Sequence, residues 1–162
     1  MAQDHLATYL NDHLAGSVAA IELLEHLEAT HSEDPLHDFF RELRADIIAD
    51  QGELEALMQA LNIDQSRTRK ASAWLTGKIT ELKLRFDDPK AGALLLFESL
   101  EALSLGIEGK RSLWIALAAT SKTTPSLRVA DYDRLQQRAQ QQRDRVEELR
   151  IKTALTALAV DG

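Results

Sequence analysis

Apolar side chains recur at alternating steps of three and four residues in four long stretches of the chain. An α-helix completes a turn in 3.6 residues, so this spacing places the apolar residues of each stretch on one helix face. The stripes run from Leu6 to Leu27, from Leu36 to Leu61, from Ala93 through Arg111 to Trp114, and from Tyr132 to Val160. No stretch of similar length alternates apolar and polar residues with a period of two. The pattern therefore predicts an all-α fold with four long helices.

Each of the three prolines follows a residue that commonly caps a helix. The three pairs are Asp34-Pro35, Asp88-Pro89 and Thr124-Pro125. Asp and Thr side chains accept hydrogen bonds from the free N–H groups of a first helical turn, and proline is tolerated at the first helical position. We therefore expect helices to begin at these three prolines. A further helix is expected to begin near Gln3 or Asp4.

The lengths of the connections predict how the four helices are arranged. Short segments at 31–34 and 120–124 join the helices in pairs, which makes each pair a tight antiparallel hairpin. The 27 or so residues between the hairpins, at 62–88, are too many for a simple loop in a compact domain. Helical spacing persists within this crossover segment, at Ala71, Trp74, Leu75, Ile79, Leu82 and Phe86. We expect one domain, 1–162, forming an antiparallel four-helix bundle with a short amphipathic fifth helix on the crossover.

Two hairpins of long helices joined by a long crossover resemble the ferritin-like fold, over nearly the whole chain. The segment 9–27, YLNDHLAGSVAAIELLEHL, also looks like the first helix of uncharacterised bacterial members of that superfamily. The di-iron members of the family carry a Glu on each of two helices and a Glu-x-x-His pair on each of the other two. The resemblance therefore implies a ferritin-like bundle and raises the question of an iron or manganese site.

The histidines depart from the di-iron pattern. All five fall within the first 37 residues, and the one Glu-x-x-His, Glu28 to His31, stands at the end of the first helix, away from the middle of the bundle. A standard di-iron centre is therefore not expected. Polar residues do interrupt the inward stripes near mid-helix, at His13, Ser17, Asp50, Ser104 and Gln142.

If the hairpins close near residues 33 and 123, His13, Asp50 and Glu101 meet in one polar layer. Two interpretations of this layer remain open. The favoured one is a set of mutually hydrogen-bonded polar groups that fixes how the helices pack. The alternative is a non-standard site in which His13, Asp50 and Glu101 bind iron or manganese.

Composition excludes several classes of protein. The chain has 162 residues and no cysteine, which excludes disulfide scaffolds, cysteine-based zinc and iron–sulfur sites and thiol catalysis. The sequence shows no secretory leader and no apolar run long enough to cross a bilayer. We therefore expect a cytoplasmic protein without a membrane partner.

The net charge of −7 is distributed unevenly. Residues 1–66 hold fourteen acidic and two basic residues, whereas residues 67–90 hold seven basic and three acidic residues. We therefore expect the basic crossover to lie near the acidic first hairpin, through Arg67, Arg69, Lys70, Lys78, Lys83 and Arg85. A nucleic-acid partner is not expected, because the chain is acidic and the crossover aromatics, Trp74 and Phe86, fit the buried face of a helix.

The helix after Pro89 is apolar on every side of its first turn, from Leu94 to Phe97. A helix of this kind is buried on more than one face. We expect the crossover to cover part of it and a second copy of the chain to contribute a contact, giving a homodimer through this helix. Gly106 and Gly109 are expected to allow close approach of another backbone.

These observations favour a non-catalytic protein with no cofactor, acting as a binding or interaction module or in a stress-related role. The alternative is a metal-binding ferritin-like oxidoreductase with His13, Asp50 and Glu101 as ligands. The absence of Glu-x-x-His pairs from the later helices weighs against this alternative.

Overall fold

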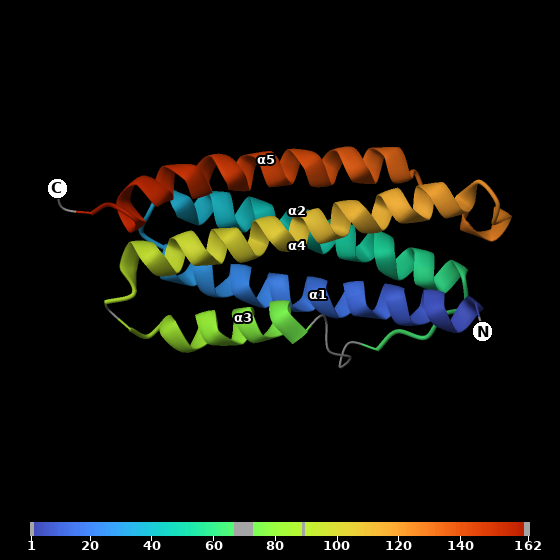
Figure 1. Ribbon diagram of the computed structural model, residues 1–162, viewed down its shortest axis with the longest axis horizontal. Coiled ribbons are helices and arrows are strands. Elements are labelled where there is room, and N and C mark those ends of the chain that lie inside the picture. Colours follow the sequence, from blue (N-terminus) through green and yellow to red (C-terminus); the bar gives the residue numbers. More distant parts are fainter. Residues whose placement is uncertain (1, 67–72, 89, 161–162) are drawn as a thin grey trace.

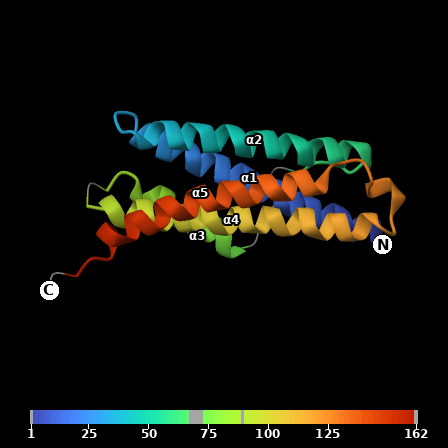
Figure 2. The ribbon, with the colours of Figure 1, turned by 90° about the horizontal axis from the view of Figure 1, so that it is seen from above.

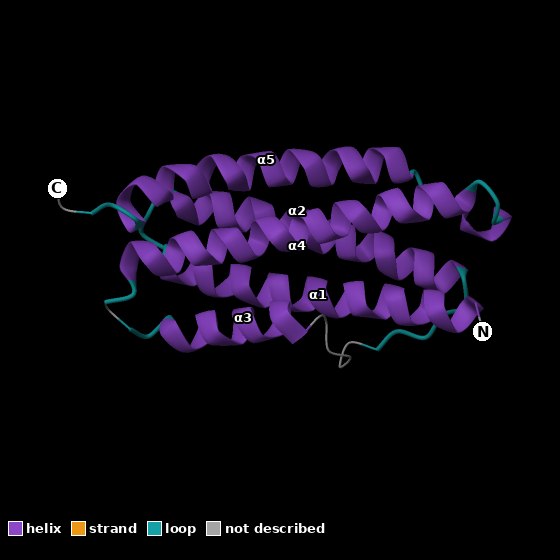
Figure 3. Ribbon diagram, in the orientation of Figure 1, coloured by secondary structure: helices purple, strands orange, loops and turns teal. Residues whose placement is uncertain are grey.

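The computed structural model describes residues 2–66, 73–88 and 90–160, and these residues form helices and no strand (Figure 3). The helices are α1 (Ala2–Thr30), α2 (Leu36–Ala60), α3 (Ala73–Arg85), α4 (Gly92–Ser121) and α5 (Tyr132–Ala157), with a short 3₁₀ helix, η1 (Pro125–Leu127). The predicted all-α class is confirmed. Among the described residues, no helix combines the length and the apolar character needed to cross a membrane.

The four long helices lie side by side as two hairpins, α1 with α2 and α4 with α5 (Figures 1 and 2). The colours of Figure 1 show that α1 and α5 run in one direction and α2 and α4 in the other. The hairpins meet where α1 contacts α4 and where side chains of α2 and α5 pair, as in Glu53 with Arg134. Helix α3 packs against α1 and α4.

The buried residues form two apolar clusters that occupy opposite ends of the helices. The first cluster joins Leu24 of α1, Phe40 of α2 and Leu100 of α4, close to the turn between α1 and α2. The second joins Leu14, Met58 and other residues at the opposite end of the hairpins. On α2 and α4, polar residues separate the two clusters, and the candidate site lies at that level.

The structure describes two of the three prolines at which helices were predicted to begin, Pro35 and Pro125. Helix α2 begins directly after Pro35, as predicted, and the Leu36 N–H donates to Asp34 Oδ1 at 2.9 Å. The Asp88 carboxylate accepts a similar bond from the Lys90 N–H at 2.9 Å, and α4 begins two residues later, at Gly92. Pro89 itself lies outside the described residues.

The prediction that the last helix begins at Pro125 is wrong. Pro125 begins η1, and α5 begins at Tyr132 after Asp131, whose Oδ1 accepts a hydrogen bond from the Arg134 N–H at 3.1 Å. The Tyr132 hydroxyl donates to the carbonyl of Leu127 at 2.6 Å. Because Leu127 and Tyr132 are both buried, this turn has a small apolar centre that interrupts the helix.

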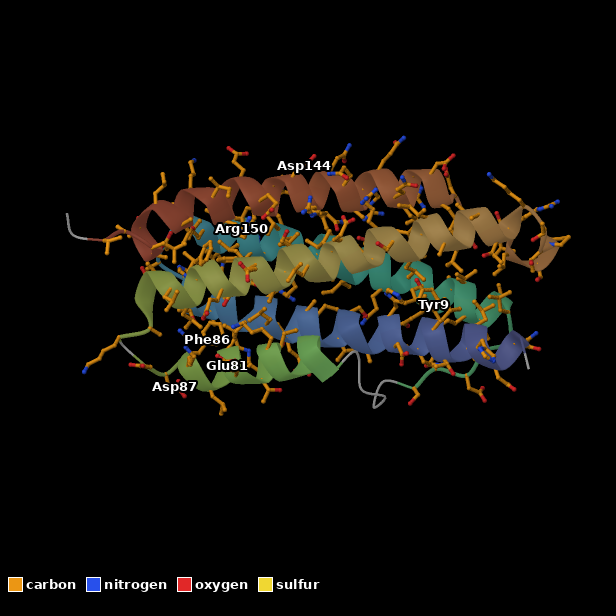
Figure 4. The ribbon with its side chains drawn as sticks, in the orientation of Figure 1. Tyr9, Glu81, Phe86, Asp87, Asp144 and Arg150 are labelled. Carbon is orange, nitrogen blue, oxygen red and sulfur yellow. The ribbon has the colours of Figure 1, made fainter. Side chains whose placement is uncertain are left out.

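The predicted fifth helix is confirmed as α3. Ile79 and Leu82 are buried in the first apolar cluster. Phe86, labelled in Figure 4, packs on the edge of this cluster. Its ring lies beside that of His26 of α1, with the ring centres 5.4 Å apart. Ala71 lies outside the described residues, and the side chains of Trp74 and Leu75 are not described.

The basic residues of the crossover contact the first hairpin only in part, although all of them were predicted to lie near it. Lys83 pairs with Glu22 on α1, in agreement with attraction to the acidic hairpin. Lys78 and Arg85 instead pair with Glu98 on α4, with Lys78 Nζ 3.5 Å from its carboxylate. The remaining basic residues, Arg67, Arg69 and Lys70, lie outside the described residues.

Helix α4 is less completely covered than its sequence predicts. Leu95 and Phe97 are buried, but Leu94 and Leu105 are 41% and 47% exposed. The predicted contact with a second copy of the chain therefore stays a prediction. Among the described residues of the chain, a Cβ atom at Gly106 or Gly109 would meet nothing within 4 Å, so no backbone of the same chain approaches closely there. Close approach by a second copy stays a prediction.

The docking of α3 can be tested with two leucines of the same helix. We expect Leu82→Ala to lower the free energy of unfolding by about 2 to 5 kcal/mol, because Leu82 is fully buried. Leu84 is 79% exposed, so Leu84→Ala should change it by no more than about 0.5 kcal/mol. Urea unfolding followed by circular dichroism measures both. Equal effects of the two substitutions would contradict this packing of α3.

Candidate functional site

A buried polar cluster joins three of the four long helices between the two apolar clusters. Asp50 of α2 accepts hydrogen bonds on Oδ2 from Lys110 Nζ of α4 at 2.5 Å and from Gln142 Nε2 of α5 at 2.8 Å. Lys110 Nζ also donates to Gln142 Oε1. Each of the three side chains therefore contacts the other two, and together they tie the first hairpin to the second.

The Asp50 carboxylate is 1% exposed and faces two cations. The Arg138 guanidinium of α5 lies 3.3 Å from Oδ1, while Lys110 occupies the other oxygen. Burial lowers the pKa of the Lys110 ammonium group, and the charge of Asp50 opposes this effect. Removing one partner of a buried ion pair lowers the stability of the fold, because the remaining charge is then buried without a counter-charge.

The predicted polar layer is present in part. Asp50, Ser104 and Gln142 are buried, as their positions in the stripes predict. His13 is half-buried on α1, where its ring packs edge-on against Tyr9 with the ring centres 4.7 Å apart. Glu101 is 46% exposed and lies 3.7 Å from Arg150 Nη1 of α5.

The candidate ligands His13, Asp50 and Glu101 do not gather around one point. Within the described residues, no group of three or more His, Asp or Glu side chains is placed to hold a metal ion. The carboxylate of Asp50 is instead directed at Lys110 and Arg138. The geometry therefore gives Asp50 the role of joining helices.

The two cations of the cluster, Lys110 and Arg138, were not predicted from the sequence. The third stripe follows a step of four residues from Ile107 to Arg111, whereas a step of three leads to Lys110. Arg111 pairs with Glu108 on its own helix, at 2.9 Å. The predicted burial of Asp50 could have indicated these cations, because a buried carboxylate requires a cationic or hydrogen-bonding partner.

A pocket of about 390 Å³ lies beside the cluster, between α1, α2 and α4. Small residues create the space: Gly16 and Ala20 on α1, and Gly106 and Gly109 on α4, line its walls. Apolar side chains form most of the remaining wall. They are Ile47, Leu54, Leu103, Leu105, Ile107, Leu113 and Trp114.

Seven polar side chains also line the pocket, and those of Ser17, Gln51, Asp50 and Lys110 are paired. Ser17 Oγ accepts a hydrogen bond from Gln51 Nε2 at 2.8 Å and donates to the Leu14 carbonyl at 2.6 Å. Burial lowers the pKa of His13, against the opposing charge of Asp12, so the imidazole is neutral at pH 7. Asp50 and Lys110, which also line the pocket, form the ion pair described above.

This arrangement has the size and lining of a site for a small molecule. Ligand pockets in proteins commonly measure about 300 to 1,000 Å³ and combine apolar walls with a few placed polar groups. The chain matches no protein-family model, no curated protein and no solved structure. The walls of the pocket are therefore the strongest indication of function.

The cluster can be tested by removing its negative charge. We expect Asp50→Asn to lower the free energy of unfolding by about 3 kcal/mol, because Lys110 and Arg138 lose their counter-charge. Glu53→Gln breaks the more exposed pair with Arg134 and serves as the matched control on the same helix. Its effect should be much smaller. Comparable losses in both variants, measured by urea unfolding, would contradict a structural role for Asp50.

The environment of His13 predicts a pH effect on stability. Its pKa is lower in the folded chain than in the unfolded chain, so the unfolded chain binds more protons as the pH falls through about 6.5. The free energy of unfolding should therefore fall as the pH falls below that value. His13→Gln should remove this contribution, whereas His5→Gln, at an exposed position of α1, should retain it. Urea unfolding at intervals from pH 7.5 to 5 gives the two difference curves, and identical curves would contradict the burial of His13.

Proposed function

We propose that this protein is a non-catalytic binding module that holds one small, largely apolar molecule in the pocket between α1, α2 and α4. The observation that carries the proposal is the pocket itself, about 390 Å³ of space beside a buried ion-paired cluster. Its walls are mostly apolar, and they draw on residues of both apolar clusters. Such walls favour an apolar ligand through removal of its surface from water.

The open, mostly apolar wall of the pocket supports a role in binding. Tyr9 and Leu105 line the pocket and are 38% and 47% exposed, so part of its wall meets water. Covering apolar surface of this kind with a ligand is favourable by about 25 cal/mol for each Å² removed from water. Glycine inside a helix costs about 1 kcal/mol relative to alanine, and Gly106 and Gly109 both face the pocket. A larger residue at Gly106 has room, since a Cβ there would meet nothing within 4 Å. The chain thus gives up stability at a place where apolar side chains could have filled the interior.

We further propose that the chain is a ferritin-like four-helix bundle in which α3 lies on the crossover. This is supported by the hairpins α1/α2 and α4/α5 and by the long connection between them. Ligand and cofactor sites of helical bundles are built between facing helices near the bundle core. Here that region holds the Asp50 cluster and the adjoining apolar pocket, which suits binding without a metal.

The proposal predicts that filling the pocket abolishes binding without harming the fold. Gly106→Leu should extend a side chain into the pocket and eliminate binding of N-phenyl-1-naphthylamine, a neutral dye whose fluorescence rises in apolar surroundings. Thermal unfolding should show a fold at least as stable as the wild type, because leucine favours a helix by up to about 1 kcal/mol over glycine.

Gly52→Leu is the matched control for this experiment. Gly52 is also inside a helix with open space at its Cβ position, but it is exposed and does not line the pocket. This variant should gain helix stability and keep the dye affinity of the wild type. Failure of the wild type to bind, or equal binding by both variants, would contradict the proposed function.

A further inference from the structure

The buried cluster beside the pocket holds more positive than negative charge. Its single carboxylate, Asp50, faces two cations, with Lys110 Nζ 2.5 Å from Oδ2 and Arg138 Nη2 3.3 Å from Oδ1. The neighbouring acidic residues of α2, Asp46 and Glu53, are far less buried and pair with arginines of α5. Water screens these outer pairs more strongly than the cluster. An excess of one positive charge therefore remains around Asp50.

Lys110 is the cation of this cluster that lines the pocket, whereas Arg138 does not. Its side chain extends from α4 to Asp50 on α2, and 16% of it is exposed. An ammonium group has three N–H donors. Two of them reach Asp50 Oδ2 and Gln142 Oε1, and among the described residues the third has no acceptor. Lys110 therefore keeps both exposed surface and a donor that a bound molecule can use.

The other ionisable groups of the pocket wall do not offset this excess. The His13 imidazole is neutral at pH 7, because burial lowers its pKa. Asp12 is only half-buried and has interactions of its own. An anion that enters the pocket loses part of its hydration, and a charge-assisted hydrogen bond from an ammonium group compensates for that loss. A cation entering it would meet Lys110 without an unpaired carboxylate.

We propose that the ligand is a small amphipathic monocarboxylate whose apolar body fills the pocket and whose carboxylate accepts a hydrogen bond from Lys110 Nζ. This inference rests on the proposed binding function and adds the chemical class of the ligand. In the complex, two carboxylates face the two cations Lys110 and Arg138. A phosphate monoester carries up to two negative charges and would exceed the single excess charge, so a carboxylate matches it better.

Three naphthalenes with substituents of nearly the same shape test this class. They are 2-naphthoate, which is negatively charged, 2-acetylnaphthalene, which is neutral, and 2-naphthamidine, which is positively charged. Dissociation constants are measured by isothermal titration calorimetry on the full chain at pH 7.5. The carboxylate should bind at least about tenfold more tightly than the ketone, which is the contribution expected of one hydrogen bond between charged groups. The amidinium should bind most weakly, although the net charge of −7 favours cations.

Substitution of Lys110 tests which residue recognises the carboxylate. Lys110→Gln removes the excess charge and leaves Asp50 facing Arg138 alone. The advantage of the carboxylate over the ketone should then disappear, while the ketone binds as before and so shows that the variant is folded. Arg111→Gln is the matched control, because Arg111 is the next residue of α4, pairs with Glu108 and does not line the pocket. This variant should keep the preference for the carboxylate.

The carboxyl group of the ligand reports on its surroundings in the unaltered chain. The chemical shift of 2-naphthoate labelled with ¹³C at the carboxyl carbon is followed from pH 8 to 5.5. An ordinary carboxyl group has a pKa of about 4, and a neighbouring ammonium group holds the pKa at or below that value. The bound signal should therefore not move. A titration within this range would overturn the contact with Lys110, because burial without a cation raises the pKa of a carboxyl group.

The remaining outcomes separate this inference from the proposed function. Equal affinities for the carboxylate and the ketone, or tightest binding of the amidinium, would overturn the carboxylate class and leave the apolar pocket standing. Equal loss of the carboxylate preference in Lys110→Gln and Arg111→Gln would overturn the role of Lys110. Failure of all three molecules to bind would overturn both the inference and the proposed function.

Discussion

The buried carboxylate of Asp50 is the constraint on which the arrangement of the two hairpins depends. Apart from the crossover, the first hairpin is covalently independent of the second, so non-covalent contacts decide how the two hairpins are aligned. A carboxylate at 1% exposure cannot slide, because only one register brings Lys110 and Gln142 to it. Displacement by one helical turn would leave a charge unpaired in the interior, at a cost of several kcal/mol.

The cluster also explains the position of the pocket. On α2 the residues to either side of Asp50, Ile47 and Leu54, belong to different apolar clusters, and both line the pocket. The ion pair joins α2 to α4 at this level. The small residues of α1 and α4 leave space beside it. The same polar cluster therefore holds the hairpins together and forms one wall of the candidate binding site.

Much of the fold could be predicted from the sequence, because helix periodicity is a local property. The stripes located the long helices, and the interval between hairpins located α3 with Ile79 and Leu82 on its buried face. The stripe positions of Asp50 and Gln142 correctly predicted that both are buried. The start of α5 could not be predicted from Pro125, because packing of Leu127 with Tyr132 overrides the local preference.

The candidate site was harder to predict, because it depends on long side chains and on missing volume. Lys110 and Arg138 lie beside the buried faces of their helices and reach Asp50 with long, flexible side chains. Helix periodicity assigns such residues to the exposed face, so it does not predict these contacts. Gly106 and Gly109 indicated close packing in the sequence, yet in the structure they leave space. Whether small residues on two helices make a contact or a pocket depends on the helix separation, and the buried cluster contributes to setting it.

If the space between α1, α2 and α4 is a binding site and not a packing defect, it should hold an apolar molecule. A crystal structure of the chain grown with 2-ethylnaphthalene, which has no polar group, is the decisive measurement. We expect electron density for the two rings between α1, α2 and α4, against Gly106 and Ile107, with the contacts of Asp50 to Lys110 and Gln142 unchanged. Wall side chains collapsed into this space, or ordered water filling it with the naphthalene elsewhere, would show that the space is not a binding site.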